Sequence, residues 1–132
     1  MENAEVLVDT SVLIEYFRKK NKEKTFLYNL SLNYEPVISV ITKYEFLSGI
    51  NDKNFDAVNE ILNRLKTLDF DSKSAEIASE IFRNVKVTNH CPGIADIFIA
   101  SAAIKHSLKL ATFNVKHFTA IPKIKILDIH SI

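Results

Sequence analysis

Short runs of consecutive apolar residues recur along the chain, separated by longer segments in which apolar residues follow a helical spacing. "EVLVD" at 5–9 and "PVISV" at 36–40 are continuous rather than alternating, which is typical of strands buried on both faces. Pro36 stands at the start of its run, where a missing N–H is tolerated. Further short strands are expected at "LDF" (68–70), "KLAT" (109–112) and "IKILDI" (124–129).

Between these runs the apolar residues follow the period of an α-helix. The segment 55–66 carries a single apolar stripe, which predicts an amphipathic helix packed on a core. Other helices are expected over 11–20, 23–33, 42–49, 75–85 and 91–106. Helices that alternate with short buried strands predict an α/β fold with a mostly parallel sheet.

The composition indicates one ordinary globular domain. The chain has 132 residues, of which 47% are hydrophobic and 25% are charged. This fits a single domain over 1–132 with a substantial core. The formal net charge of +1 is too balanced to indicate a nucleic-acid binder by itself. A basic cluster spans 18–24, and we interpret it as a solvated helix end rather than an RNA-contacting patch.

Cysteine and histidine usage excludes several kinds of site. Cys91 is the single cysteine, so the chain cannot form an internal disulfide or a cysteine-based zinc site. The histidines lack the spacing of a zinc site; they are His90, His106, His117 and His130. No apolar run reaches the ~20 residues that span a bilayer, and no basic-then-apolar leader opens the chain. We therefore expect a cytoplasmic protein without membrane contact.

Side chains with oxygen donors lie near the ends of the predicted strands. Asp9 ends the first strand, and Glu45 lies in the first turns of the helix after the second. Asn114 follows the strand 109–112, and Asp96 lies near the start of the helix before that strand. Sites in open parallel sheets form beyond the carboxyl ends of the strands. We therefore expect these four side chains to meet in one crevice.

Three carboxylates in one crevice repel one another at pH 7 and need a compensating cation. A hard divalent ion meets that need, and Mg²⁺ or Mn²⁺ suits coordination by carboxylates and water. Such an ion polarises a phosphate and activates a bound water. The arrangement therefore favours phosphodiester hydrolysis.

Each acidic residue also has a purely structural interpretation. Asp9 can cap the helix that follows it. Glu45 can complete a capping box with Thr42, and Asp96 suits the first turn of a helix. Their joint occurrence in apolar surroundings favours the functional interpretation, as in "DIFIA", where four apolar residues follow Asp96.

In this order, the motifs resemble those of the PIN-domain ribonucleases, in particular the small VapC-type toxins of toxin–antitoxin pairs. "VLVDTSVLIEY" (6–16) resembles the opening strand with its first metal-binding Asp, and "SVITKYEFLSG" (39–49) resembles the segment bearing its Glu. "ADIFIASAAIKHSLKLATFNVKHFTAI" (95–121) resembles the third acidic motif, its helix and the closing T-x-N-x-x-H/D-F region. The likeness covers nearly the whole chain.

The resemblance implies a PIN fold, an α/β/α sandwich around a mostly parallel sheet, and an endoribonuclease that depends on Mg²⁺ or Mn²⁺. It assigns metal binding and catalysis to Asp9, Glu45 and Asp96, and an assisting catalytic role to Asn114. It also implies an RNA substrate, a homodimer, and a cognate antitoxin that docks near the active-site groove. Supporting roles around the site are expected for Thr10, Ser11, Thr112 and His117.

The closing motif departs from the pattern of many relatives. They place a fourth acidic residue there, whereas "TFNVKHF" at 112–118 offers Asn114 and His117 and no acid. One metal ion or two therefore stays open, and a non-catalytic PIN-like binding module with an incomplete site is the alternative. A phosphoryl-transfer domain fits less well, because Ser11 stands where such a phosphatase has a second Asp and no Gly-rich phosphate loop is present.

Overall fold

The computed structural model describes residues 3–86 and 91–132, and a parallel sheet organises them. The sheet has four strands in the order β3-β2-β1-β4, and every neighbouring pair is parallel. The strands are β1 (Glu5–Val8), β2 (Glu35–Ser39), β3 (Lys66–Leu68) and β4 (Lys109–Ala111). Their parallel direction brings all four carboxyl ends to the same edge of the sheet.

The central strand β1 is hydrogen-bonded on both sides. Leu7 pairs with Val37 of β2 and with Leu110 of β4, and all three are fully buried. Helices cover both faces of the sheet, so neither face of the strand meets water. This explains why the apolar run of β1 is continuous rather than alternating.

Helices make up the outer layers and the connections. The α-helices are α1 (Thr10–Arg18), α2 (Phe26–Ser31), α3 (Val40–Ser48), α4 (Asp52–Leu62), α5 (Ser72–Val85) and α6 (Ile94–Lys105). Three short 3₁₀ turns complete the fold: η1 (Lys22–Lys24), η2 (Val115–His117) and η3 (Ile129–Ser131). None of the helices within 3–86 and 91–132 combines the length and apolar character needed to cross a membrane.

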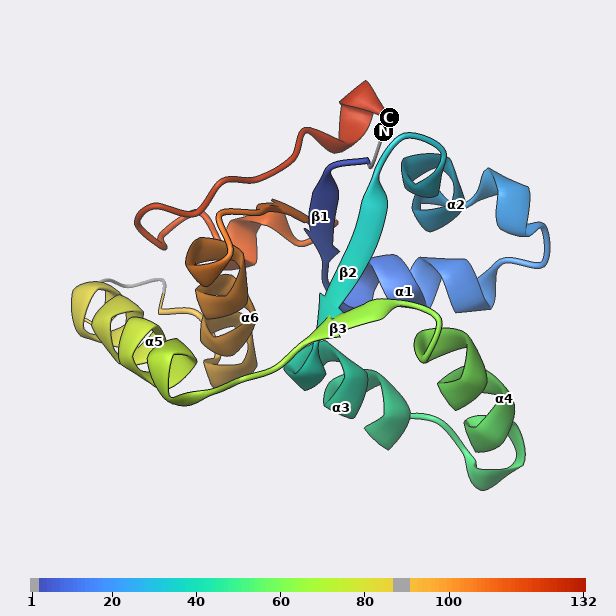
Figure 1. The fold of residues 1–132 in the computed structure, drawn as a ribbon, viewed down its shortest axis with the longest axis horizontal. Coiled ribbons are helices and arrows are strands. Elements are labelled where there is room, and N and C mark those ends of the chain that lie inside the picture. The colour runs from blue at the N-terminus through green and yellow to red at the C-terminus, as the bar shows by residue number, and fades with distance from the viewer. Residues whose placement is uncertain (1–2, 87–90) are drawn as a thin grey trace.

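Two hydrophobic cores lie on opposite faces of the sheet. Leu7 and Val37 pack with α5 and α6, whereas Val6, Val8 and Ile38 pack with α1, α2 and α4. Figure 1 shows these two groups of helices on either side of the strands. The α/β/α sandwich with a parallel sheet is thereby confirmed.

The expected helix over 23–33 is interrupted. Thr25 is fully buried and its hydroxyl accepts a hydrogen bond from the N–H of Tyr28 at 3.2 Å, which begins α2 at Phe26. The preceding residues form only the turn η1, capped by Asn21. The basic cluster that leads into this turn includes Lys22, whose Nζ donates to the carbonyl of Tyr16 at 2.6 Å. That contact covers the carboxyl end of α1 and agrees with the structural interpretation of the cluster.

The expected strand over 124–129 is wrong. Only Ile126 bridges to the sheet, opposite Leu110. Lys123, before the bridge, adopts the left-handed conformation (φ 68°), and Asp128, after it, caps the turn η3. The segment therefore touches β4 at one point and turns away. The short strand expected at 68–70 exists, but it spans Lys66–Leu68, and the helix expected over 55–66 spans Asp52–Leu62.

Candidate active site at the carboxyl edge of the sheet

Asp9 follows β1 directly and caps α1. Its side chain is only 4% exposed. One carboxylate oxygen accepts from the backbone N–H of Ser11 at 3.0 Å and from the Ser11 hydroxyl, and the other accepts from the hydroxyl of Thr112. The capping interpretation of Asp9 is therefore confirmed. The three hydrogen bonds use three of the about four lone pairs of the carboxylate, so about one stays open to a further ligand.

The loop after β4 is tied to the loop after β1. Thr112 is fully buried, and its hydroxyl donates to Asp9 while accepting from the N–H of Asn114 at 2.9 Å. The N–H of Phe113 donates to the hydroxyl of Ser11 at 3.0 Å. Because β1 and β4 are parallel neighbours, residues 103 positions apart in sequence hold the Asp9 carboxylate in place.

Glu45 reaches the same edge from α3. The hydroxyl of Thr10 donates to Glu45 Oε1 at 3.0 Å, so the residue after Asp9 orients the second carboxylate. The capping box expected with Thr42 is absent: α3 begins at Val40 with Ser39 as its cap, and the buried Thr42 hydroxyl has no hydrogen-bond partner among the described residues.

Asp96 lies in the first turn of α6, as expected. Gly93 caps that helix without a side chain, which leaves the first-turn N–H groups without side-chain caps. Burial raises the pKa of Asp96 above its usual value; His117 opposes this, and the negative charges of Glu45 and Asp9 add to it. The three carboxylates thus lie near enough for their charges to interact.

The closing motif flanks Asp96. Asn114 caps the turn η2, and His117 ends it. The Nδ1 atom of His117 lies 3.3 Å from Oδ2 of Asp96, and the His117 side chain is 57% exposed. The turn η2 therefore places an imidazole beside the third carboxylate.

The donor set fits a partly hydrated divalent ion. Within the described residues, no three His, Cys, Asp or Glu side chains are close enough to enclose an ion by themselves. Mg²⁺ sites in proteins seldom need such an enclosure, because the ion keeps several waters and uses one or two carboxylates. Burial is the main cause of the raised pKa of Asp96, and the nearby negative charges of Glu45 and Asp9 add to it, which a bound cation would offset. Asp9, Glu45 and Asp96 are the residues that would hold the ion.

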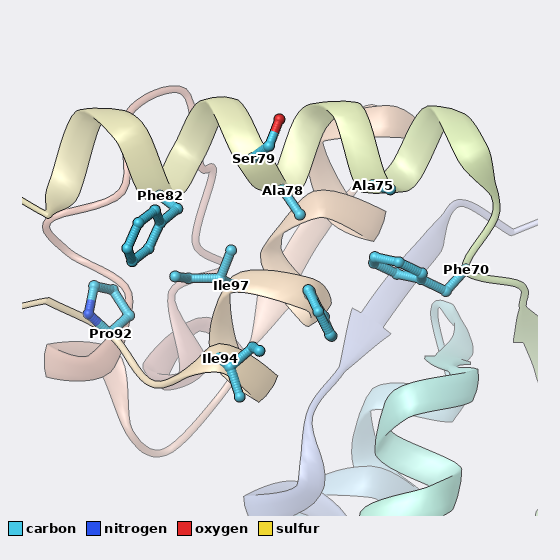
Figure 2. A pocket seen from close by; sticks show the side chains of 9 residues that line it. Phe70, Ala75, Ala78, Ser79, Phe82, Pro92, Ile94 and Ile97 are labelled. Carbon is cyan, nitrogen blue, oxygen red and sulfur yellow. The ribbon is translucent and has the colours of Figure 1, made fainter.

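Two pockets lie beside the helices of the site, and one of them includes one of the three carboxylates in its wall. A pocket of about 430 Å³ between α1 and α3 includes Thr10 and Glu45 in its wall. Another pocket of about 430 Å³ lies between α5 and α6 (Figure 2). Its lining consists of Phe70, Ala75, Ala78, Ser79, Phe82, Pro92, Ile94, Ile97 and Phe98. It offers no titratable group, so we place the candidate site at the sheet edge.

Comparison with known proteins agrees with this geometry. The profile of the PIN domain matches residues 6–124, and the chain belongs to the PIN-domain family. Ribonuclease VapC1 of Methanocaldococcus jannaschii is 35% identical over 96% of this chain and 90% of its own length. The tRNA(fMet)-specific endonuclease VapC of Salmonella typhimurium is 30% identical over 92% of this chain and 96% of its own.

The fold is also shared with solved structures. DNA-bound VapBC from Salmonella typhimurium superposes with a TM-score of 0.83 at 28% identity, covering 96% of this chain and 98% of that chain. The resemblance to PIN-domain ribonucleases of the VapC type is therefore confirmed. The individual roles assigned to the site residues stay predictions. His90 lies outside the described residues.

Proposed function

We propose that this protein is a Mg²⁺- or Mn²⁺-dependent endoribonuclease that acts as the toxin of a toxin–antitoxin pair. The observation that carries the proposal is the gathering of Asp9, Glu45 and Asp96 from three distant segments at one edge of the sheet. Membership of the PIN-domain family and the named ribonuclease activity of its relatives support it.

The residues of the site have two roles: some bind the metal ion, and others orient the carboxylates that bind it. Asp9, Glu45 and Asp96 would hold the ion, and a bound ion would supply polarisation of the scissile phosphate and a lowered pKa of water. Thr112 and Ser11 fix the Asp9 carboxylate through their hydroxyls, and Thr10 fixes Glu45. Asn114 lies at the same edge and presents an amide to the RNA.

The test is Asp9→Asn in a cleavage assay with Mg²⁺. Asn is as good a helix cap as Asp, so the fold is retained while one anionic ligand is lost. We expect cleavage to fall at least about a hundredfold, the scale on which single electrostatic groups act in catalysis. Initiator tRNA and total RNA are the substrates to use, because one relative is a tRNA(fMet)-specific endonuclease.

Asp128→Asn is the matched control for this substitution. Asp128 is also an Asp that caps a helical turn, since its side chain accepts from the N–H of His130 at 3.0 Å. This control variant should cut at the parent rate. Cleavage by Asp9→Asn at the parent rate in Mg²⁺ would show that the metal assignment is wrong.

The proposed function also implies two protein partners, a cognate antitoxin and a second copy of this chain. Structures of relatives are toxin–antitoxin complexes, which supports a cognate antitoxin for this chain. We place its docking segment along the pocket between α1 and α3, where the wall includes Glu45. A homodimer and a cytoplasmic location complete the proposal, and light scattering of the purified chain measures the oligomer directly. The non-catalytic alternative is not favoured, because all three acidic residues are present.

A further inference from the structure

The side chain of His117 has a position that its ion pair does not explain. Its Nδ1 lies 3.3 Å from Asp96 Oδ2, but the imidazole is 57% exposed and the carboxylate side chain is 26% exposed. Exposed pairs of this kind contribute little to stability, because water and salt screen them. The structure therefore does not need this pairing in order to fold.

The turn that carries His117 is nevertheless firmly held. Phe118, the next residue, is fully buried in the core formed with α5 and α6. At the other end, the N–H of Asn114 is bonded to the hydroxyl of Thr112, which itself bonds Asp9. The N–H of His117 donates to the carbonyl of Asn114 at 2.9 Å. These contacts fix the backbone of the turn, which positions the imidazole of His117 beside Asp96.

The spacing suits two ligands of one ion. Two donors at right angles around an octahedral ion, each at about 2.1 Å, lie about 3 Å apart. The 3.3 Å between Nδ1 and Oδ2 is close to that separation. Half of the imidazole surface faces solvent, so an ion with its waters can reach Nδ1 without a change in the fold.

We propose that His117 is a nitrogen ligand of the metal through Nδ1, next to Asp96, and that it biases the site toward Mn²⁺ and other transition ions over Mg²⁺. Imidazole nitrogen suits first-row transition ions, whereas Mg²⁺ prefers oxygen. An acid at this position leaves an all-oxygen site. This inference rests on the proposed function, since it concerns the same metal.

The first experiment compares Mn²⁺ and Mg²⁺ affinities by titration calorimetry for the parent, His117→Asp and His117→Ala. We expect the ratio of the Mg²⁺ Kd to the Mn²⁺ Kd to fall about tenfold in both variants, the scale of losing one contact at a metal site. His130→Ala is the control, because His130 is an exposed histidine at the opposite end of the closing segment. Ratios within twofold of the parent in both His117 variants overturn the inference.

The second experiment detects a nitrogen ligand of the bound ion directly. Electron spin-echo spectroscopy of Mn²⁺ bound to the parent detects a directly bound nitrogen, and ¹⁵N-histidine labelling identifies it. We expect a nitrogen coupling that changes on labelling and is lost in His117→Ala. Binding that depends on Asp96 but shows no nitrogen coupling overturns the inference and leaves the proposed function intact. The absence of any saturable binding overturns both.

Discussion

The carboxylate of Asp9 accepts hydrogen bonds on both oxygens and is almost completely buried. Capping and metal binding had been set against each other as interpretations of this residue. In the structure they are compatible, because the cap and the Thr112 hydroxyl together leave about one lone pair of the carboxylate for a cation. A buried anion held only by hydroxyls and one amide is also the kind of group that a cation stabilises.

Replacing Thr112 by Val should remove the hydroxyl and leave the carboxylate of Asp9 short of a partner. We expect the free energy of unfolding to fall by about 1–3 kcal/mol, because a buried polar group loses its hydrogen bond. Urea denaturation measures this change. Thr112→Ser keeps the hydroxyl and should lose much less, and equal losses in the two variants would contradict a role for the hydrogen bond.

The raised pKa of Asp96 predicts a dependence of stability on pH in the metal-free protein. Between the usual carboxyl pKa and the raised one, the folded protein binds more protons than the unfolded chain. The free energy of unfolding therefore falls as pH rises through that window. Asp96→Asn should be more stable than the parent at pH 7, and the difference should vanish below the usual carboxyl pKa. Thermal melts across pH that show no such convergence would contradict the prediction.

At the scale of elements, most of the fold was predictable because strands and helices have different apolar periods. The placing of Asp9, Glu45 and Asn114 at one edge needed only the rule for parallel sheets. The cap at Thr25 was missed, although a threonine directly before the apolar residues Phe26 and Leu27 is a signal for the start of a helix. The strand expected over 124–129 was wrong because the left-handed backbone at Lys123 is not encoded by an apolar run.

Contacts between side chains of different helices and strands could not be predicted from the sequence. The hydrogen bond from Thr10 to Glu45 depends on how α1 and α3 pack, and so does the absence of a capping box at Thr42. The pairing of His117 with Asp96 depends on how the turn η2 meets α6. Sequence reasoning located these residues near one another but not their partners.

Asp71 joins two helices of one layer and provides a test at this scale. Its side chain caps α5 and pairs with Lys105 of α6 at 2.6 Å, and the hydrogen bond from Lys105 is the main cause of its strongly lowered pKa. Because the pKa of Asp71 is lower in the folded protein, its ionised side chain stabilises the fold at pH values above the pKa of the unfolded chain. This stabilisation is lost as the pH falls. Asp71→Ala should lower the Tm at pH 7 and have progressively less effect in acid. Asp71→Asn, which keeps the cap, should lose less.

For the whole molecule, a metal that binds only the folded chain should raise its stability. Mn²⁺ at a hundred times its Kd adds about 2.7 kcal/mol, which raises the Tm of a chain of this size by about 10 °C. Scanning calorimetry with and without Mn²⁺ measures the shift. Asp96→Asn should lose the shift, and Asp128→Asn should keep it. If the Tm of the parent protein does not change on addition of Mn²⁺ or Mg²⁺, the proposed metal site is wrong.

The pairing of β1 with β4 has a consequence for the timing of synthesis. Val6 of β1 lies opposite Lys109 of β4. The sheet therefore cannot be completed until β4, the last strand in the sequence, has been synthesised. Thr112, Asn114 and His117 all follow β4. A nascent chain on the ribosome therefore carries no assembled centre until nearly its whole length has left the exit tunnel, and a product truncated before β4 would lack the complete site.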